Sequence, residues 1–406
     1  MTPAVSTLGN GFTVATLTVP GVSTAAVGLY VDVGARHEAA ADNGLAHFLE
    51  HMVFKGTRTR SARAIAEAIE DAGGSLNAWT ARDVTAFHAR TLASDVELGV
   101  ELIADLVRNP RFDADDIERE REVVLSELGE ARDTPDDLVW DVAQALAFPD
   151  QPLGRAILGD EGTLAAMDAA GLNRWLATHY RGAGSVLAAA GAVDHAALVR
   201  QAEGLFGDLA AEAGPVAEAG VWRGGSEHVK KRSEQAHIVL GFAGPGIHDP
   251  GYFATQLFAT AAGGGMSSRL FQELREERGL AYSIGASHSP YAETGLFSVS
   301  MATQPRDAAQ ALDLSRATLA ATAATLSPAE LARAKAQLKA SLLFAMEDMG
   351  GLSSWLGQRW LSHRAFIDVP ALTATIDAVP LEAVRAAGAA LLAGAQVEAR
   401  VGPKRG

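Results

Sequence analysis

The order of strand-like and helix-like segments repeats once along this 406-residue chain, and this repeat limits the architecture more than any other feature. In the first half, β-branched and apolar runs at 13–19 and 25–33 predict strands, and segments with helical spacing follow them. The second half has the same order, with strands predicted at 236–242, 282–289 and 295–303 and helices at 251–261, 267–277, 307–320, 327–349 and 380–392. Strands followed by helices in each half predict two α+β domains of similar size.

Composition places the boundary between the two halves. Segment 208–233 is rich in Ala, Gly and Glu and lacks periodicity, so we interpret it as a linker. We therefore expect an N-terminal domain at 1–207 and a C-terminal domain at 234–406. The helices expected in the first domain are 44–54, 61–69, 94–107, 113–130, 136–147, 162–179 and 195–206.

Charge and cysteine content exclude several classes of function. The formal net charge is −15, which argues against a nucleic-acid partner and disfavours anionic membranes. The chain has no cysteine, so any metal must be held by His and carboxylate side chains. The first ten residues lack a basic region followed by an apolar core, and no apolar run is long enough to span a membrane. We expect a cytoplasmic protein.

The segment 44–54 predicts a helix with two chemically distinct faces, with Asn43 as its N-cap. Its apolar residues recur at helical spacing and form a core-facing stripe, namely Leu45, Phe48, Leu49 and Met52. His47 and His51 are four residues apart and share the other face with Glu50. Two such imidazoles can bind one zinc ion, and a neighbouring carboxylate can accept a proton from water. The alternative is a pair of exposed histidines with no metal.

A third ligand is predicted on the helix 113–130. Glu120 and Glu127 are seven residues apart and therefore lie on one face, interleaved with apolar residues at Ile117, Val123 and Val124. Carboxylates in such surroundings are costly to bury unless they are paired or bind a metal. A solvated run of acidic residues is the alternative interpretation.

The string HFLEHMVFKGT at 47–57 resembles the signature of the M16 (pitrilysin-like, inverzincin) zinc metallopeptidases, and most closely the branch (M16B) of the mitochondrial processing peptidase β-subunit. In that family a glutamate ligand follows H-x-x-E-H by some 76 residues, which is Glu127 here. The match continues in REREVVLSE at 119–127 and LGRAILGDEGTL at 153–164. The resemblance implies two LuxS/MPP-like domains, each a mostly antiparallel sheet packed with helices.

The resemblance also assigns roles to individual residues. It implies one zinc ion per chain, bound by His47, His51 and Glu127, with Glu50 as general base. Glu120, seven residues before the third ligand, would orient a ligand histidine.

Further residues are assigned to the substrate by the same resemblance. The strand edge at Asn77 and Ala78 would pair with an extended peptide. Arg275 and Tyr282, in LREERGLAYS, would grip the peptide near the bond that is cut. Without the resemblance, Asn77 is an ordinary edge-strand residue and Arg275 a solvated helix residue.

The resemblance implies a zinc endopeptidase that acts on extended or presequence-like peptides inside a chamber formed by a dimer. Because both the metal motif and the Arg/Tyr pair lie on one chain, we expect a homodimer, with a heterodimer with an inactive paralogue left open. The alternatives are a non-catalytic core or assembly subunit of the same fold and a purely structural metal site. The acidic charge favours substrates with basic residues near the cut as a hypothesis. The three glycines at 263–265 lack the lysine of a phosphate-binding loop, so that interpretation is rejected.

Overall fold

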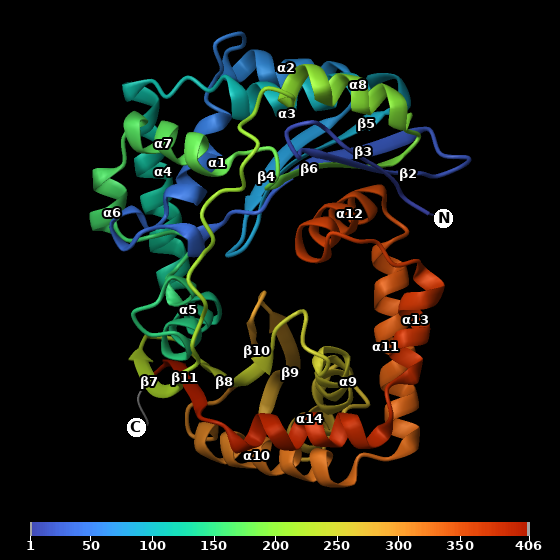
Figure 1. Cartoon of the computed structure of the whole chain (residues 1–406). Coiled ribbons are helices and arrows are strands. Elements are labelled where there is room, and N and C mark those ends of the chain that lie inside the picture. Colours follow the sequence, from blue (N-terminus) through green and yellow to red (C-terminus); the bar gives the residue numbers. More distant parts are fainter. Residues whose placement is uncertain (1, 404–406) are drawn as a thin grey trace. The chain divides into compact units, whose positions relative to one another are not determined.

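The computed structural model describes residues 2–403 and divides into two compact units, each assembled from three segments of the chain (Figure 1). Unit 1 contains the chain up to Leu128, Ala156–Glu218 and Leu343–Asp368. Unit 2 contains Gly129–Arg155, Ala219–Leu342 and the chain from Val369 onward. The sequence-based boundaries at 207 and 234 describe domains as continuous stretches, and they stay a prediction.

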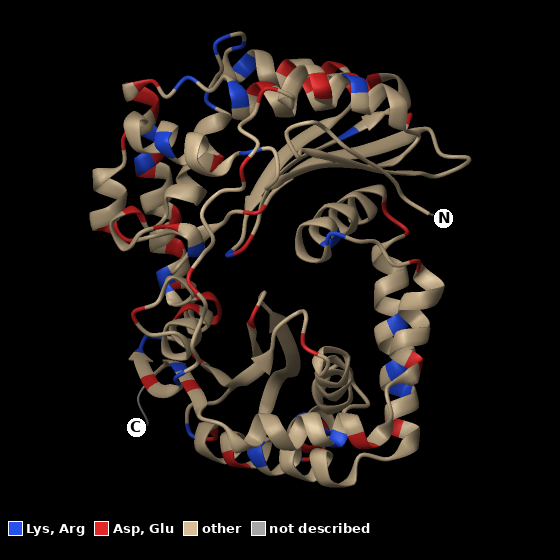
Figure 2. Cartoon of the chain, viewed as in Figure 1, with Lys and Arg blue, Asp and Glu red and all other residues tan. Residues whose placement is uncertain are grey.

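Unit 1 is built on a six-stranded sheet with the order β1-β2-β6-β3-β5-β4. Only β2 and β6 are parallel neighbours, and the other pairs are antiparallel. The strands are β1 Ala4–Thr7, β2 Thr13–Thr18, β3 Thr24–Val31, β4 Ser75–Thr80, β5 Thr85–Leu92 and β6 Ser185–Gly191. Strands β2, β3, β4 and β6 carry no Lys, Arg, Asp or Glu, and Figure 2 shows the charged residues gathered mainly on helices and loops. This pattern matches a sheet that is covered on both faces.

Helices cover both faces of the unit 1 sheet, and β3 shows the division. Val27 and Leu29 belong to the core beneath α3 and α8, whereas Tyr30 points to the opposite face and packs with Leu352 and Leu356 of α12. The unit 1 helices are α1 Leu45–Val53, α2 Ala62–Asp71, α3 Val96–Arg108, α4 Ala114–Asp133, which continues into unit 2, α6 Glu161–Ala166, α7 Ala169–His179, α8 His195–Phe206 and α12 Met349–His363.

Unit 2 repeats this plan with a five-stranded sheet in the order β7-β11-β8-β10-β9, in which only β7 and β11 are parallel. Its strands are β7 Gly225–Lys230, β8 Ala236–Pro245, β9 Ala281–Pro290, β10 Thr294–Thr303 and β11 Gln396–Gly402. Its helices are α5 Pro135–Ala147, α9 Tyr252–Gly263, α10 Ala308–Thr325, α11 Pro328–Ala345, which continues into unit 1, α13 Val369–Ala378 and α14 Leu381–Ala393. The predicted fold class, two α+β domains with mostly antiparallel sheets, is confirmed.

Three local expectations need revision. The helix expected at 162–179 is two helices, because Asp168 leaves the helical conformation and caps α7 by accepting a hydrogen bond from Gly171 N. The expected linker 208–233 includes strand β7, which pairs with β11. The stretch 350–379 carried no assignment from sequence, and it forms most of α12 and α13.

No helix within residues 2–403 is both long enough and apolar enough to cross a bilayer.

Candidate metal centre

Helix α1 carries both histidines, and its start is fixed by a residue outside the helix. The N-cap is Gly44, whose φ of +94° favours glycine, and the side chain of Asn43 does not cap the helix. The carboxylate of Glu38 does so instead, accepting hydrogen bonds of 2.8 Å from both Gly44 N and Ala46 N. Asn43 donates to Glu38 at 3.0 Å and thereby holds the cap in place. The predicted Asn43 cap is therefore wrong, and no local spacing rule points to Glu38, which lies six residues before the N-cap Gly44.

The two predicted faces of α1 are confirmed. Leu45, Phe48, Leu49 and Met52 are buried in the unit 1 core. His47 and His51 are partly exposed on the other face, and their ring centroids are 4.7 Å apart. The apolar stripe fixes the rotation of the helix, so the two histidines are presented together with part of each ring exposed.

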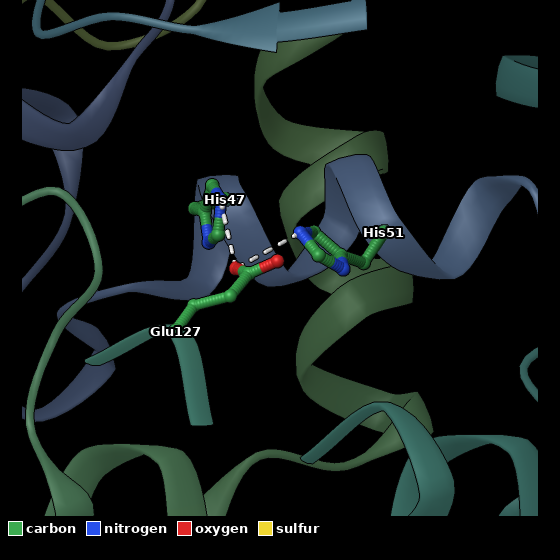
Figure 3. A group of neighbouring side chains, drawn as sticks. All are labelled: His47, His51 and Glu127. Atoms are coloured by element: carbon green, nitrogen blue, oxygen red, sulfur yellow. Dashed lines mark ion pairs between the residues drawn. The ribbon is translucent and has the colours of Figure 1, made fainter. Parts of the chain in front are cut away.

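Glu127 of α4 lies against both imidazoles (Figure 3). Its Oε2 is 3.4 Å from His51 Nε2 and 3.9 Å from His47 Nε2, and one donor atom from each residue lies within 4.8 Å of the other two. Two atoms that each bind zinc at about 2.1 Å with tetrahedral angles are about 3.4 Å apart. Two imidazole nitrogens and one carboxylate oxygen at these separations fit zinc, with three protein donors.

The environment of His47 keeps its imidazole neutral. Burial lowers the pKa of His47 to about 4, and the neighbouring His51 lowers it as well. Its Nδ1 is buried and has no hydrogen-bond partner among the described residues. A neutral ring is the form that binds a metal, so this site requires no deprotonation at His47 near neutral pH.

Glu50 lies beside this group with one carboxylate oxygen unused. Burial raises the pKa of Glu50, while the hydroxyl of Thr80 and the nearby His51 lower it. Its Oε2 accepts no hydrogen bond within the described part of the chain. Tyr180, which the sequence did not single out, is buried, and burial together with the charge of Glu50 raises its pKa. A half-buried carboxylate with a free oxygen is suited to accept a proton.

Glu120 connects to the group through His51. It is 5% exposed, and its Oε2 lies 3.2 Å from His51 Nδ1, as expected for a residue that orients this ring. Its Oε1 lies 2.7 Å from Lys55 Nζ, a contact that the sequence did not reveal. The apolar face of α4 is centred on Ile117, Val124 and Leu128, whereas Val123 is 42% exposed. The sequence predicts Val123 on the same face as Glu120 and Glu127, and its exposure shows that this side of the helix extends beyond the buried face.

Asn77 and Ala78 lie on β4, the edge strand of the unit 1 sheet. Asn77 is exposed, and its Oδ1 accepts a hydrogen bond of 2.9 Å from Ala78 N. At the end of β4, Thr80 Oγ1 is 3.5 Å from the carbonyl oxygen of Ala46 in α1. The free edge of the sheet therefore ends beside the helix that carries Glu50.

Arg275 and Tyr282 belong to unit 2 and lie close to each other. The guanidinium carbon of Arg275 is 4.8 Å from the ring centroid of Phe271 and 5.8 Å from that of Tyr282. The predicted helix 267–277 is instead mainly a π-helical turn, Phe271–Glu276, in which Glu277 N donates to Gln272 O. Such turns are frequent at functional sites. Tyr282 is 73% exposed, so its ring is accessible.

Comparisons with known proteins agree with this architecture. Residues 13–161 match the family described as insulinase (peptidase family M16), and residues 166–338 match the peptidase M16 inactive domain. The chain is 39% identical to an uncharacterized zinc protease of Mycobacterium bovis, over 99% of this chain and 94% of the relative. It is 37% identical to a probable mitochondrial-processing peptidase subunit beta of Arabidopsis thaliana, over 94% of this chain and 74% of the relative.

A solved structure shares the fold. The chain resembles the peptidase M16 inactive domain from Pseudomonas fluorescens with a TM-score of 0.91, covering 100% of this chain and 98% of that one. The sequence identity is 21%, so this likeness supports the fold alone.

Proposed function

The chain belongs to peptidase family M16, and on that premise we propose that it is a zinc-dependent endopeptidase with His47, His51 and Glu127 as metal ligands. The observation that carries the proposal is the convergence of three donor atoms within 4.8 Å from α1 and α4. Relatives named as zinc proteases, such as one from Streptomyces coelicolor at 37% identity, support the choice of metal. Two features distinguish this site from a purely structural one. Glu50 lies beside it, and three protein ligands leave one position open for chemistry.

Glu50 is the proposed general base. Zinc held by His47, His51 and Glu127 would act as a Lewis acid toward a peptide carbonyl and would lower the pKa of bound water. The free Oε2 of Glu50 accepts the proton of the attacking water, and the same carboxyl delivers it to the leaving amine. Burial raises the pKa of Glu50 above its ordinary value, which makes this carboxylate a better proton acceptor than an exposed one.

The edge of β4 is the proposed binding surface for the peptide. An extended substrate would add to β4 as a further strand, with main-chain hydrogen bonds near Ala78. Ala78 N donates to Asn77 Oδ1, so an incoming strand replaces this local hydrogen bond. Because Thr80 at the end of β4 contacts α1, a strand bound here is directed toward Glu50. Backbone recognition of this kind accepts many sequences.

Arg275 and Tyr282 are the proposed second contact with the same peptide. A guanidinium packed on two rings is held in place, and it offers donors to a carbonyl oxygen that gains negative charge. Replacing Arg275 with Ala should lower turnover while zinc binding stays unchanged. Equal turnover by this variant would remove Arg275 from the site.

The proposed assembly is a homodimer that encloses the substrate, with a heterodimer with an inactive paralogue as the second outcome. Light scattering of the purified chain alone decides between them. A purified monomer that becomes active only when a second chain is added would favour the heterodimer. A preference for basic residues near the cut follows from the net charge of −15, and equal cleavage of matched neutral and Arg-containing peptides would remove it.

The decisive experiment measures cleavage of a quenched fluorescent peptide by the purified chain, with and without a chelator. Activity that is lost on chelation and restored by zinc supports the proposal. Zinc binding without turnover on any peptide would instead favour a non-catalytic assembly subunit of this fold. Absence of zinc binding would overturn the assignment of His47, His51 and Glu127.

A further inference from the structure

Lys55 lies just beyond the end of α1 and forms an ion pair with the buried carboxylate of Glu120. It follows His51 by four residues, so both side chains project from the same side of the chain toward α4. Lys55 Nζ is 2.7 Å from Glu120 Oε1, and His51 Nδ1 is 3.2 Å from Glu120 Oε2. The two oxygens of one carboxylate therefore bind two different residues, and Glu120 is the bridge between them.

Glu120 needs both contacts because its carboxylate is almost completely buried. A buried carboxylate is stable as an anion only when charged or hydrogen-bonding partners surround it. As an anion it accepts the proton of His51 Nδ1, which leaves Nε2 of this ring unprotonated and available to a metal. Without the ammonium group, Glu120 Oε1 would lose its partner and the orientation of the carboxylate toward His51 would be held less firmly.

The position of Lys55 is itself fixed by the turn that follows it. Gly56 has a φ of +130°, which favours glycine, and reverses the chain after the helix. Beyond it, the hydroxyl groups of Thr57 and Thr59 donate to Asp105 Oδ2 at 2.6 and 2.7 Å. Asp105 is a buried carboxylate on α3, so this network anchors the turn to the core of unit 1. Lys55 is thereby held between the end of α1 and α4.

We propose that Lys55 is a positioning residue of the metal centre, acting through Glu120 to fix the tautomer and orientation of His51. The inference rests on the proposed zinc site, but it concerns a residue whose ion pair is with Glu120 and not with a proposed metal ligand. The inference explains why the positive charge of Lys55 lies near a proposed zinc site. Lys55 forms its ion pair with Glu120 and not with the proposed ligand Glu127.

The test compares the zinc affinity of the full chain in three variants, by competition with a chelator. Lys55→Met keeps the length of the side chain and removes its charge, and we expect zinc affinity to fall about tenfold, at the lower end of the effect of losing a group that supports a ligand. Lys55→Arg keeps the charge and should retain most of the affinity. Arg58→Met is the matched control, because Arg58 is exposed and has no ion pair within residues 2–403. It should bind zinc like the unaltered chain.

A double-mutant cycle identifies the route of the effect. In a Glu120→Gln background, Lys55→Met should weaken zinc binding by less than twofold, because the group through which it acts is gone. Equal losses in both backgrounds, or equal losses in Lys55→Met and Arg58→Met, would show a general effect of charge and overturn the inference.

The zinc-free chain supplies a readout that does not depend on metal. The ¹⁵N chemical shifts of the His51 ring should report a proton on Nδ1 in the unaltered chain and a mixture of tautomers in Lys55→Met. If the unaltered chain bound no zinc but Lys55→Met still changed the tautomer of His51, the proposed function would fail and the positioning role would stand. If zinc bound and neither affinity nor tautomer changed in Lys55→Met, the positioning role alone would be refuted.

Discussion

Glu120 of unit 1 and Glu330 of unit 2 are both helical carboxylates paired with a cationic side chain, yet their remaining hydrogen-bond partners differ. Glu330 receives two hydrogen bonds from the guanidinium of Arg269, at 2.6 and 2.8 Å, and two more from the main chain and hydroxyl of Ser327. Glu120 receives Lys55 on one oxygen and His51 on the other. The partners of Glu330 are Arg269 and Ser327, neither of which is a proposed metal ligand. Glu120 instead contacts His51, whose other ring nitrogen lies 3.4 Å from Glu127.

The difference separates groups that stabilise the fold from groups that can do chemistry. Every partner of Glu330 is a donor that the fold supplies, and the pKa of this carboxyl is lowered to about 2, chiefly by Arg269. Around Glu120, in contrast, His47 Nδ1 and Glu50 Oε2 have no partner in the described chain, and burial raises the pKa of Glu50. Unused polar atoms next to convergent ligand atoms indicate a functional site more strongly than the number of charges does.

The largest expected effect comes from Glu50→Gln. An amide cannot accept the proton of water, so kcat for peptide cleavage should fall by about 10² to 10⁴. Zinc content should be unchanged, because Glu50 is not among the three convergent ligands. Metal analysis and steady-state kinetics on the same preparation check both parts. Peptide cleavage at the normal rate by this variant would exclude Glu50 as the general base, and the proposed difference in role between this site and Glu330 would then be wrong.

Glu127→Gln should affect the metal first and turnover as a consequence. The neutral amide is a poorer ligand than the carboxylate whose Oε2 lies 3.4 and 3.9 Å from the two imidazoles. Losing groups that merely support a ligand weakens metal binding by about 10- to 100-fold, so zinc affinity here should fall by at least about 100-fold. Chelator competition measures this loss. Activity that returned at high zinc concentration would confirm that the defect lies in binding, whereas full affinity would exclude Glu127 as a ligand.

Glu330→Gln should reduce stability without touching zinc. Its pKa of about 2 in the folded chain lies below the ordinary 4.5, so the carboxylate stabilises the fold fully above about pH 4.5, and this contribution is lost as the pH falls toward 2. Arg269 keeps its hydrogen bonds to Thr325, so we expect a loss of about 1–3 kcal/mol at pH 7. Denaturant unfolding from pH 7 to 3 should show a flatter pH dependence in the variant. A parallel loss of zinc affinity would mean that the two carboxylates are not independent.

The sequence predicted the helix faces that carry His47, His51 and Glu127 because its signals there are local or strongly periodic, and the family resemblance linked the two faces; their role as ligands stays a prediction. The four-residue spacing of His47 and His51 and the apolar stripe beside them need only a helix, and the structure contains that helix at Leu45–Val53. The spacing of Glu120 and Glu127 needs only the next long helix. The fold class followed from the repeated order of strands and helices for the same reason.

Other features could not be found because they depend on contacts between distant segments. Glu38 caps α1 from six residues away, and Lys55 meets Glu120 only because α4 packs beside the end of α1. Helix α12 packs on the unit 1 sheet, although every strand of that sheet precedes it by more than 150 residues. The last of these strands, β6, ends at Gly191, and α12 begins at Met349. Spacing along the chain carries no information about such partners. The exposed Val123 shows the remaining limit, since periodicity alone did not locate the centre of the buried face of α4.

The smallest expected effect, Glu118→Gln, tests whether position on α4 or the mere presence of acid matters. Glu118 precedes Glu120 by two residues, so it points to a different side of the helix, where it is exposed and paired with Arg121. Arg121 lowers the pKa of Glu118, but a solvated pair of this kind contributes little, so neither the unfolding midpoint nor zinc affinity should change measurably. Glu120→Gln, measured in parallel, should weaken zinc binding by about 10- to 100-fold. Equal losses in the two variants would mean that the negative field of α4 as a whole attracts the metal. Loss in Glu120→Gln alone would assign the effect to the bridge from Lys55 to His51.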